Sequence, residues 1–127
     1  MPTTATKTKT TKEIANKLKK FCEKGNYEAA QMELFAKDAV SIEPSASSVF
    51  DKETKGLDAI IKKGKKWYDM VLKTHSLEVS EPMIAGNTFS LTMRLDVTMK
   101  EGGRMDVTEL CIYQVKDGKI ISEQFFM

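Results

Sequence analysis

Residues 89–99 read FSLTMRLDVTM, and apolar and polar side chains alternate along the whole stretch. A period of two residues places successive side chains on opposite faces of a β-strand. The stretch therefore predicts a strand with one buried face and one face exposed to water. This alternation is the clearest structural signal in the chain, and it decides the fold class of the C-terminal half.

Turn-forming residues divide the rest of the C-terminal half into further strands. Gly86-Asn87 precedes residues 89–99, Glu101-Gly102-Gly103 follows them, and Asp117-Gly118 is typical of a hairpin turn. Neighbouring strands that are joined by such short turns run antiparallel. We therefore expect a meandering antiparallel sheet with strands at residues 77–83, 89–99, 104–116 and 119–127.

Helical patterns dominate the N-terminal part of the chain. A capping box from Thr10 to Glu13 begins a helix, and apolar residues at helical spacing continue it until Gly25. A second helix is predicted at residues 26–35, and the longest one at residues 57–73. Three helices followed by an antiparallel sheet make an α+β layout.

Three segments lie outside these helices and strands. Residues 1–10 lack apolar periodicity, so we expect a disordered tail, and the predicted domain covers residues 11–127. Residues 40–44 predict a short strand. Residues 44–56 are rich in serine and predict a loop that covers part of the domain.

Composition excludes several classes of protein. The chain has 127 residues, of which 41% are hydrophobic and 30% are charged, as suits one soluble globular domain. No apolar run approaches the roughly 20 residues of a membrane span. The net charge of +2 is far from the basic balance that neutralises nucleic-acid phosphates. We therefore expect neither a membrane protein nor a nucleic-acid-binding protein.

The cysteines and the histidine argue against metal and redox chemistry. Cys22 and Cys111 lie far apart and form no metal-ligand or redox motif. His75 is the only histidine, whereas zinc sites usually use several His or Cys ligands. We therefore expect reduced thiols in a cytoplasmic protein that uses no metal.

Glu109 is the first candidate for a functional residue. It shares the odd positions of residues 104–116 with apolar side chains such as Val107 and Cys111. An ionised carboxylate on such a face needs a hydrogen bond, a raised pKa, or a cavity that admits water or ligand. The alternatives are a β-bulge that turns Glu109 outward, or a structural hydrogen bond to a helix terminus.

Two further residues are candidates for proton transfer. Glu43 precedes Pro44, and the residue before a proline favours extended backbone, which holds this side chain near the opening of the sheet. A solvent-facing loop acid is the alternative. His75 lies between the longest helix and the sheet. It could relay protons, help to bind and orient a substrate, or simply bond to a backbone carbonyl.

Large apolar side chains could contact a ligand in the same region. We expect this of Trp67, Tyr113, Phe125 and Met93, although residues at these spacings can also simply fill a core. Charged residues are interpreted as surface. Arg94 and Asp96 are predicted to be solvated or to face a dimer partner, and the lysines at positions 62, 63, 65 and 66 to face solvent.

Two motifs resemble those of a known superfamily. Residues 34–44 read LFAKDAVSIEP and are similar to a segment with the pattern L-F-A-x-D-A-x-x-x-acid-P. Residues 113–120 read YQVKDGKI and are similar to an aromatic-x-V-x-D-G-K-I hairpin. With the order of the predicted elements, these motifs resemble the SnoaL-like members of the nuclear transport factor 2-like superfamily, which also includes ketosteroid isomerases.

The resemblance implies a fold and a site. It implies a cone-shaped, curved antiparallel sheet wrapped around three N-terminal helices, an apolar pocket inside the cone, and a homodimer formed through the outer face of the sheet. In ketosteroid isomerases the acid before the proline is the general base, and here that residue is Glu43. The isomerase's first oxyanion donor matches about Lys19, and its second matches about Cys111, or Glu109 only after a slip of two residues, so that donor pair is not reproduced.

Two classes of function remain open on this basis. One is cofactor-independent acid–base chemistry, as an isomerase or polyketide cyclase, on a small apolar carbonyl compound. Glu43 is then the base, and Glu109 a protonated donor or second acid. The other is a dimeric module that binds a small ligand or a protein and catalyses nothing, because one fold hosts many activities.

Overall fold

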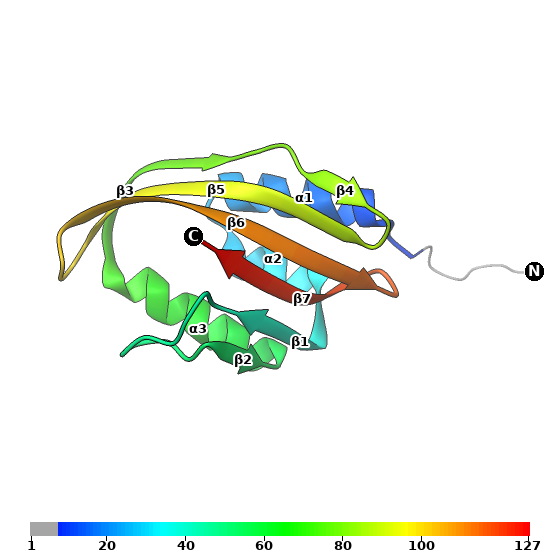
Figure 1. Cartoon of the computed structure of the whole chain (residues 1–127), viewed down its shortest axis with the longest axis horizontal. Helices are drawn as coiled ribbons and strands as arrows, with labels where there is room; N and C mark the ends of the chain where they lie inside the picture. The colour runs from blue at the N-terminus through cyan, green and yellow to red at the C-terminus, as the bar shows by residue number, and fades with distance from the viewer. Residues whose placement is uncertain (1–7) are drawn as a thin grey trace, which may run out of the picture.

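A computed structural model describes residues 8–127, which form three helices and seven strands (Figure 1). Most of the predicted tail, residues 1–7, lies outside the described residues. In chain order the elements are α1 (Thr11–Glu23), α2 (Tyr27–Leu34), β1 (Phe35–Ile42), β2 (Glu53–Lys55), α3 (Leu57–Met70), β3 (Val71–Val79), β4 (Met83–Ala85), β5 (Thr88–Met99), β6 (Arg104–Lys116) and β7 (Lys119–Phe126).

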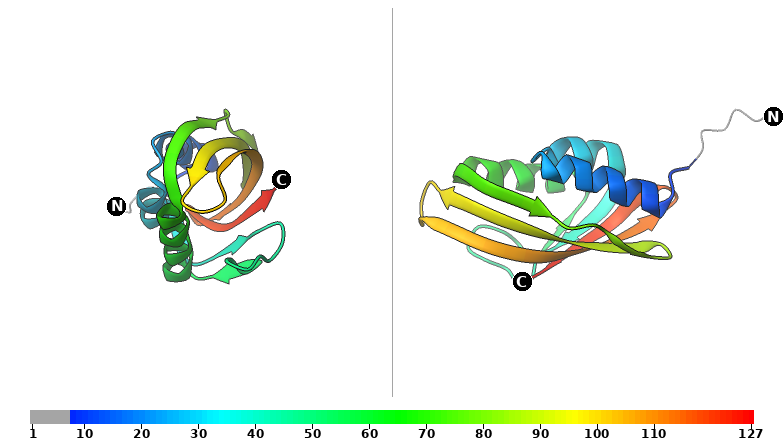
Figure 2. Two further views of the ribbon diagram at one scale, coloured as in Figure 1. Left: turned by 90° about the vertical axis from the view of Figure 1, so that its left-hand side faces the viewer. Right: turned by 90° about the horizontal axis from the view of Figure 1, so that it is seen from above.

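All strands belong to one curved sheet. The strand order is β2-β1-β7-β6-β5-β3, and β4 pairs with β5 outside this path. The sheet curls around the helices, which lie on its concave side (Figure 2). The α+β class, with a curved sheet around three helices, is therefore confirmed. One detail differs from the expected antiparallel sheet, because β1 pairs with β7 in parallel and the sheet is mixed.

The ends of the chain's helices follow the local sequence signals. Thr10 caps α1 as predicted, since its side chain accepts from the Glu13 N–H while the Glu13 carboxylate accepts from the Thr10 N–H, both at 3.1 Å. Gly25 follows the helix with φ of 71°, a backbone conformation that glycine adopts without strain.

Among residues 8–127, no helix is long and apolar enough to cross a membrane.

The boundary between α3 and β3 differs from the sequence prediction. The helix ends at Met70 rather than near residue 73, and β3 begins at Val71 rather than at residue 77. Val71 pairs with Met99 of β5, so sheet pairing extends β3 toward the helix. In the sequence, the apolar residues of this segment keep the spacing of a helix. Pairing with β5 overrides that local pattern.

The apolar face of β5 is buried, as its alternation predicts. Leu91, Leu95 and Val97 are all buried against the helices. Phe89 of β5 and Tyr113 of β6 stack with ring centroids 4.9 Å apart. Because stacked aromatic rings add to the gain from burial, this pair anchors the two longest strands at one end of the core.

Candidate functional site

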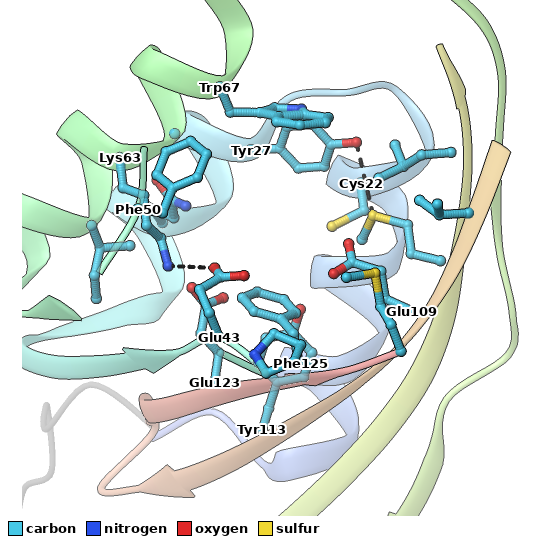
Figure 3. A pocket seen from close by; sticks show the side chains of 18 of the residues that line it. Cys22, Tyr27, Glu43, Phe50, Lys63, Trp67, Glu109, Tyr113, Glu123 and Phe125 are labelled. Carbon is cyan, nitrogen blue, oxygen red and sulfur yellow. Dashed lines mark hydrogen bonds and ion pairs between the residues drawn. The ribbon is translucent and has the colours of Figure 1, made fainter. Parts of the chain in front are cut away.

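A cavity of about 390 Å³ lies between the three helices and the concave face of the sheet (Figure 3). Its wall is largely apolar and aromatic. The large side chains on this wall come from helices, strands and the loop before β2. They include Tyr27, Phe50, Trp67, Met93, Tyr113 and Phe125. Three carboxyl groups and one ammonium group interrupt this apolar wall, namely those of Glu43, Glu109, Glu123 and Lys63.

Glu109 faces the cavity from β6. It pairs with Met93 of β5 in an unbroken register, so no bulge turns it outward. Within residues 8–127 its carboxyl group has no hydrogen bond and no ion pair. The pKa of Glu109 is raised to about 7, chiefly by burial, with smaller upward contributions from the nearby Glu43 and Glu123 and a smaller opposing effect of Lys63. Of the three outcomes expected for this residue, the cavity and the raised pKa are both found.

Glu43 lies just beyond the end of β1, at the rim of the cavity. Its backbone N–H donates to the carbonyl of Lys52 at 2.7 Å, which holds this part of the chain extended. Its Oε2 accepts a hydrogen bond from Lys63 Nζ at 2.9 Å, and both side chains are mostly buried. Figure 3 shows Glu43 and Glu109 on opposite sides of the cavity, so one small molecule could lie between them.

A chain of hydrogen bonds continues from Glu43 into the sheet. Lys63 Nζ also donates to Ser41 Oγ at 2.6 Å, and Ser41 Oγ donates to Glu123 Oε2 at 2.6 Å. We call Glu43, Lys63, Ser41 and Glu123 the Lys63 network. Ser41 is fully buried and Glu123 is 5% exposed, and burial raises the pKa of Glu123 while the Ser41 hydrogen bond opposes that rise.

Lys63 was predicted to face solvent with its neighbouring lysines, and that prediction is wrong. Its side chain is only 14% exposed and points into the cavity. The sequence held a usable signal, because Ile60, Lys63 and Trp67 are spaced three and four residues apart and share one helix face. A single charged residue on an apolar helix face near a candidate acid is such a signal.

Glu123 is a further cavity residue that was not expected from the sequence. β7 contains a bulge, since Gln114 pairs with Ser122 but Val115 pairs with Ile120, which leaves Ile121 without a partner on β6. The extra residue puts both Ile120 and Glu123 on the inner face, where strict alternation would place only one of them. Alternation counted back from Phe125 would have identified Glu123, because the bulge lies before both residues.

The predicted ligand contacts divide into two groups. Trp67, Met93, Tyr113 and Phe125 all line the cavity. His75 does not, because it is exposed on β3 and its Nε2 lies 2.6 Å from Thr98 Oγ1. Thr98 alternates with the buried Val97 and Met99 on β5, so His75 lies on the face of the sheet opposite the cavity.

The cysteines do not add a nucleophile to the site. Cys22 and Cys111 are free and buried, in agreement with the expected reduced thiols. Burial raises the pKa of Cys22 to about 12 and raises that of Cys111 as well, so both thiols stay protonated at neutral pH. Within residues 8–127, no group of three or more His, Cys, Asp or Glu side chains is arranged to hold a metal ion.

Comparisons with known proteins agree with this architecture. A proposed SnoaL-like polyketide cyclase from Mesorhizobium loti is 29% identical, and the match covers 94% of this chain and all of that one, with a TM-score of 0.86. A protein with a cystatin-like fold from Xanthomonas campestris is 17% identical over 93% of this chain and 90% of its own, with a TM-score of 0.79.

The family assignment rests on the sequence itself. A further SnoaL-like protein, from Jannaschia sp. CCS1, is 15% identical over 98% of this chain and 90% of its own, with a TM-score of 0.74, and supports the fold alone. No curated protein is significantly similar to the chain in sequence. Residues 9–127 match the SnoaL-like domain, which is nearly the whole chain. The chain therefore belongs to the SnoaL-like domain family.

Proposed function

We propose that the cavity performs acid–base chemistry without a cofactor, as an isomerase or cyclase that acts on a small apolar carbonyl compound. The observation that carries this proposal is the placement of Glu43 and Glu109 across one apolar cavity. Two carboxyl groups in different environments can hold opposite protonation states at the same pH, and such a pair can act as base and acid.

The two carboxyl groups differ in their partners. Glu43 accepts a hydrogen bond from the Lys63 ammonium, which holds its carboxylate in place at the cavity wall, and we assign Glu43 as the base. Glu109 has a pKa of about 7, so it is largely protonated below that pH and can donate a proton. An acid whose pKa lies near the working pH transfers protons most effectively.

The proposed reaction moves one proton along the substrate. Glu43 takes a proton from the carbon next to the carbonyl group, and Glu109 gives a proton to an atom at the other end of the cavity. The substrate keeps its composition, and the two carboxyl groups return to their starting states by exchanging protons with water. If the substrate carries a second carbonyl group, the same deprotonation starts an intramolecular aldol closure.

Hydrogen–deuterium exchange tests the first step without a known substrate. The protein is incubated in D2O with a panel of small ketones, including cyclohexanone and cyclic enones, and loss of the hydrogen next to the carbonyl is followed by NMR. We expect exchange of at least one ketone above the buffer rate. The Glu43→Gln variant should lose at least about 100-fold of that acceleration, since general base catalysis contributes about that much.

The matched control is Glu53→Gln. Glu53 is an exposed acid on β2 and lies outside the cavity wall, so this variant should exchange the ketone at the wild-type rate. If no ketone in the panel exchanges faster with the wild type than with Glu43→Gln, the enzymatic proposal fails. Binding of a ketone without exchange would instead support the non-catalytic ligand-binding module.

Dimer formation and a cytoplasmic location stay predictions.

A further inference from the structure

Lys63 has one N–H donor for which residues 8–127 provide no acceptor. An ammonium group has three N–H donors. Within residues 8–127, two of them have acceptors, Ser41 Oγ at 2.6 Å and Glu43 Oε2 at 2.9 Å. The Nζ atom also lies 5.6 Å from the centre of the Phe125 ring, on the cavity wall. The third N–H is therefore available to a ligand in the cavity.

Lys63 is also the only cation among the described residues that line this cavity. The other charged groups on the wall are carboxyl groups. As Glu43 takes the proton, negative charge develops on the carbonyl oxygen, and the carboxyl group of Glu123 on the same wall does not compensate for it. Stabilisation of that charge in a water-poor site needs a donor that is already in place. Lys63 is the group on the wall with the charge and the free donor for this task.

The Ser41–Glu123 pair keeps the ammonium group in position. Ser41 and Glu123 are direct neighbours across β1 and β7, and both are buried. Ser41 accepts from Lys63 and donates to Glu123, so its hydroxyl has one orientation. A lysine side chain is otherwise flexible, and its charge is effective only where the chain is held. The pair therefore restricts the flexible end of Lys63 to one place beside Glu43.

We infer that Lys63 binds the carbonyl oxygen of the substrate and stabilises the negative charge that develops on it, with Ser41 and Glu123 as positioning residues. This inference rests on the proposed acid–base function and adds the group that receives the carbonyl. Glu43 takes the proton, the C–H electron pair becomes a C=C bond, and the carbonyl π electrons move to the oxygen. The oxygen, which is two bonds away from the carbon that lost its proton, then accepts a hydrogen bond from the third N–H of Lys63.

Two probes separate binding of the oxygen from binding of the apolar ring. 4-Nitrophenolate resembles an enolate because its oxygen carries delocalised negative charge, and it absorbs at a longer wavelength than 4-nitrophenol. 4-Nitroanisole has the same ring and no ionisable oxygen. At pH 6, below the Glu109 pKa of about 7, the wild-type protein should bind 4-nitrophenol mainly as the phenolate, and the visible spectrum reports this directly.

Variants then assign the effect to Lys63. Lys63→Met should lower affinity for 4-nitrophenol about 10- to 100-fold and abolish the phenolate spectrum, since hydrogen bonds to charged groups are worth about that factor. Lys63→Arg should keep part of the phenolate signal. Ser41→Ala and Glu123→Gln should weaken the signal while 4-nitroanisole affinity stays within about threefold, which also reports that the cavity is intact.

Lys62→Met is the matched control, because Lys62 is the exposed neighbour on α3 and does not line the cavity. It should behave as the wild type with both probes. If the wild type binds 4-nitrophenol in its neutral form, or if Lys63→Met keeps the phenolate spectrum, the inference is wrong while the acid–base proposal stands. If neither probe binds the wild-type protein, both the inference and the proposed use of the cavity are contradicted.

Discussion

The two faces of the β5–β6 strand pair treat carboxyl groups in opposite ways. On the concave face Glu109 lies among apolar side chains with no hydrogen bond or ion pair within residues 8–127, and its pKa rises to about 7. On the convex face Asp96 receives two hydrogen bonds from Arg104, at 2.9 and 2.8 Å, and these lower its pKa. The position of a residue along its strand decides which face of the sheet its side chain occupies. The hydrogen-bond partners on that face decide whether the pKa of its carboxyl group rises or falls.

The convex face carries a second ion-pair cluster. Arg94 donates to both oxygens of Asp106, at 3.0 and 2.6 Å, and also to Glu78 on β3. Arg94 and Asp96 were expected to be solvated or to face a dimer partner. Both lie on the polar face of β5, as expected, and the Arg94 side chain is 41% exposed. Their charges are paired within the chain, and Asp96 is only 7% exposed. The concave face has no such compensation around Glu109, which makes that carboxyl group chemically distinct.

Glu109→Gln should produce the largest change in stability. The folded pKa of Glu109 is about 7, against 4.5 for an ordinary Glu, so ionisation destabilises the folded wild type as pH rises from 4.5 through 7. Above this window the neutral Gln variant should be more stable by on the order of 2 to 3 kcal/mol. Chemical unfolding at pH 8 measures the gain, and at pH 4.5 the two proteins should be nearly equal.

The control for this experiment is Glu101→Gln, in the exposed turn between β5 and β6. Its stability relative to the wild type should not change with pH in this window. A Glu109→Gln protein with the same pH dependence as the wild type would show that Glu109 is ionised without penalty. The contrast between the two faces would then be lost.

Arg104→Met tests the convex face and should have a smaller effect of opposite sign. The lowered pKa of Asp96 means that its pairing stabilises the fold above the ordinary Asp pKa of 3.8 and is lost as pH falls through the folded pKa. The variant should therefore be less stable than the wild type at pH 7 and approach it below pH 4. The loss stays modest because Arg104 is 62% exposed and solvent screens it.

Lys100→Met removes a neighbouring exposed charge and should leave unfolding at pH 7 unchanged, which separates loss of pairing from loss of net charge. Varying the ionic strength provides a further check. Because water and ions screen an exposed pair, high ionic strength should reduce the difference between Arg104→Met and the wild type. An Arg104→Met protein as stable as the wild type at low salt would contradict a stabilising role for this pair.

The parts of the fold that the sequence predicts well are those with local signals. The alternation at residues 89–99, the capping box at Thr10 and the hairpin at Asp117-Gly118 all appear where they were expected. Glu109 was identified from parity alone, because β5 and β6 pair without a bulge. Where the pattern depends only on neighbours in the chain, elementary stereochemistry is sufficient.

The parts that sequence analysis missed depend on contacts between distant segments. The parallel pairing of β1 with β7 joins residues 35–42 to the end of the chain, and no local pattern indicates it. The same pairing puts Ser41 beside Glu123 and so builds the Lys63 network. Glu123 itself keeps the parity of Phe125, because the bulge in β7 lies before both residues. The candidate base and acid were therefore predicted, whereas the groups that position the base were not.

His75→Ala should have the smallest effect and probes the boundary between the two faces. His75 is exposed, and its hydrogen bond to Thr98 joins β3 to β5 away from the cavity. We expect a loss of stability below about 1 kcal/mol and a 4-nitroanisole affinity within about twofold of the wild type. Trp67→Leu, on the cavity wall, should lower that affinity several-fold in the same titration.

The comparison of these two variants decides whether the sheet isolates the cavity from its convex face. Direct contact with the ligand accounts for the Trp67→Leu effect, because that ring is part of the wall. His75 is hydrogen-bonded to Thr98 and lies near the charge of Asp96, both on the strand that carries Met93 and Leu95. If His75→Ala weakens binding as much as Trp67→Leu does, the position of β5 depends on its outer hydrogen bonds. The cavity would then have to be treated as coupled to the ion pairs on the convex face.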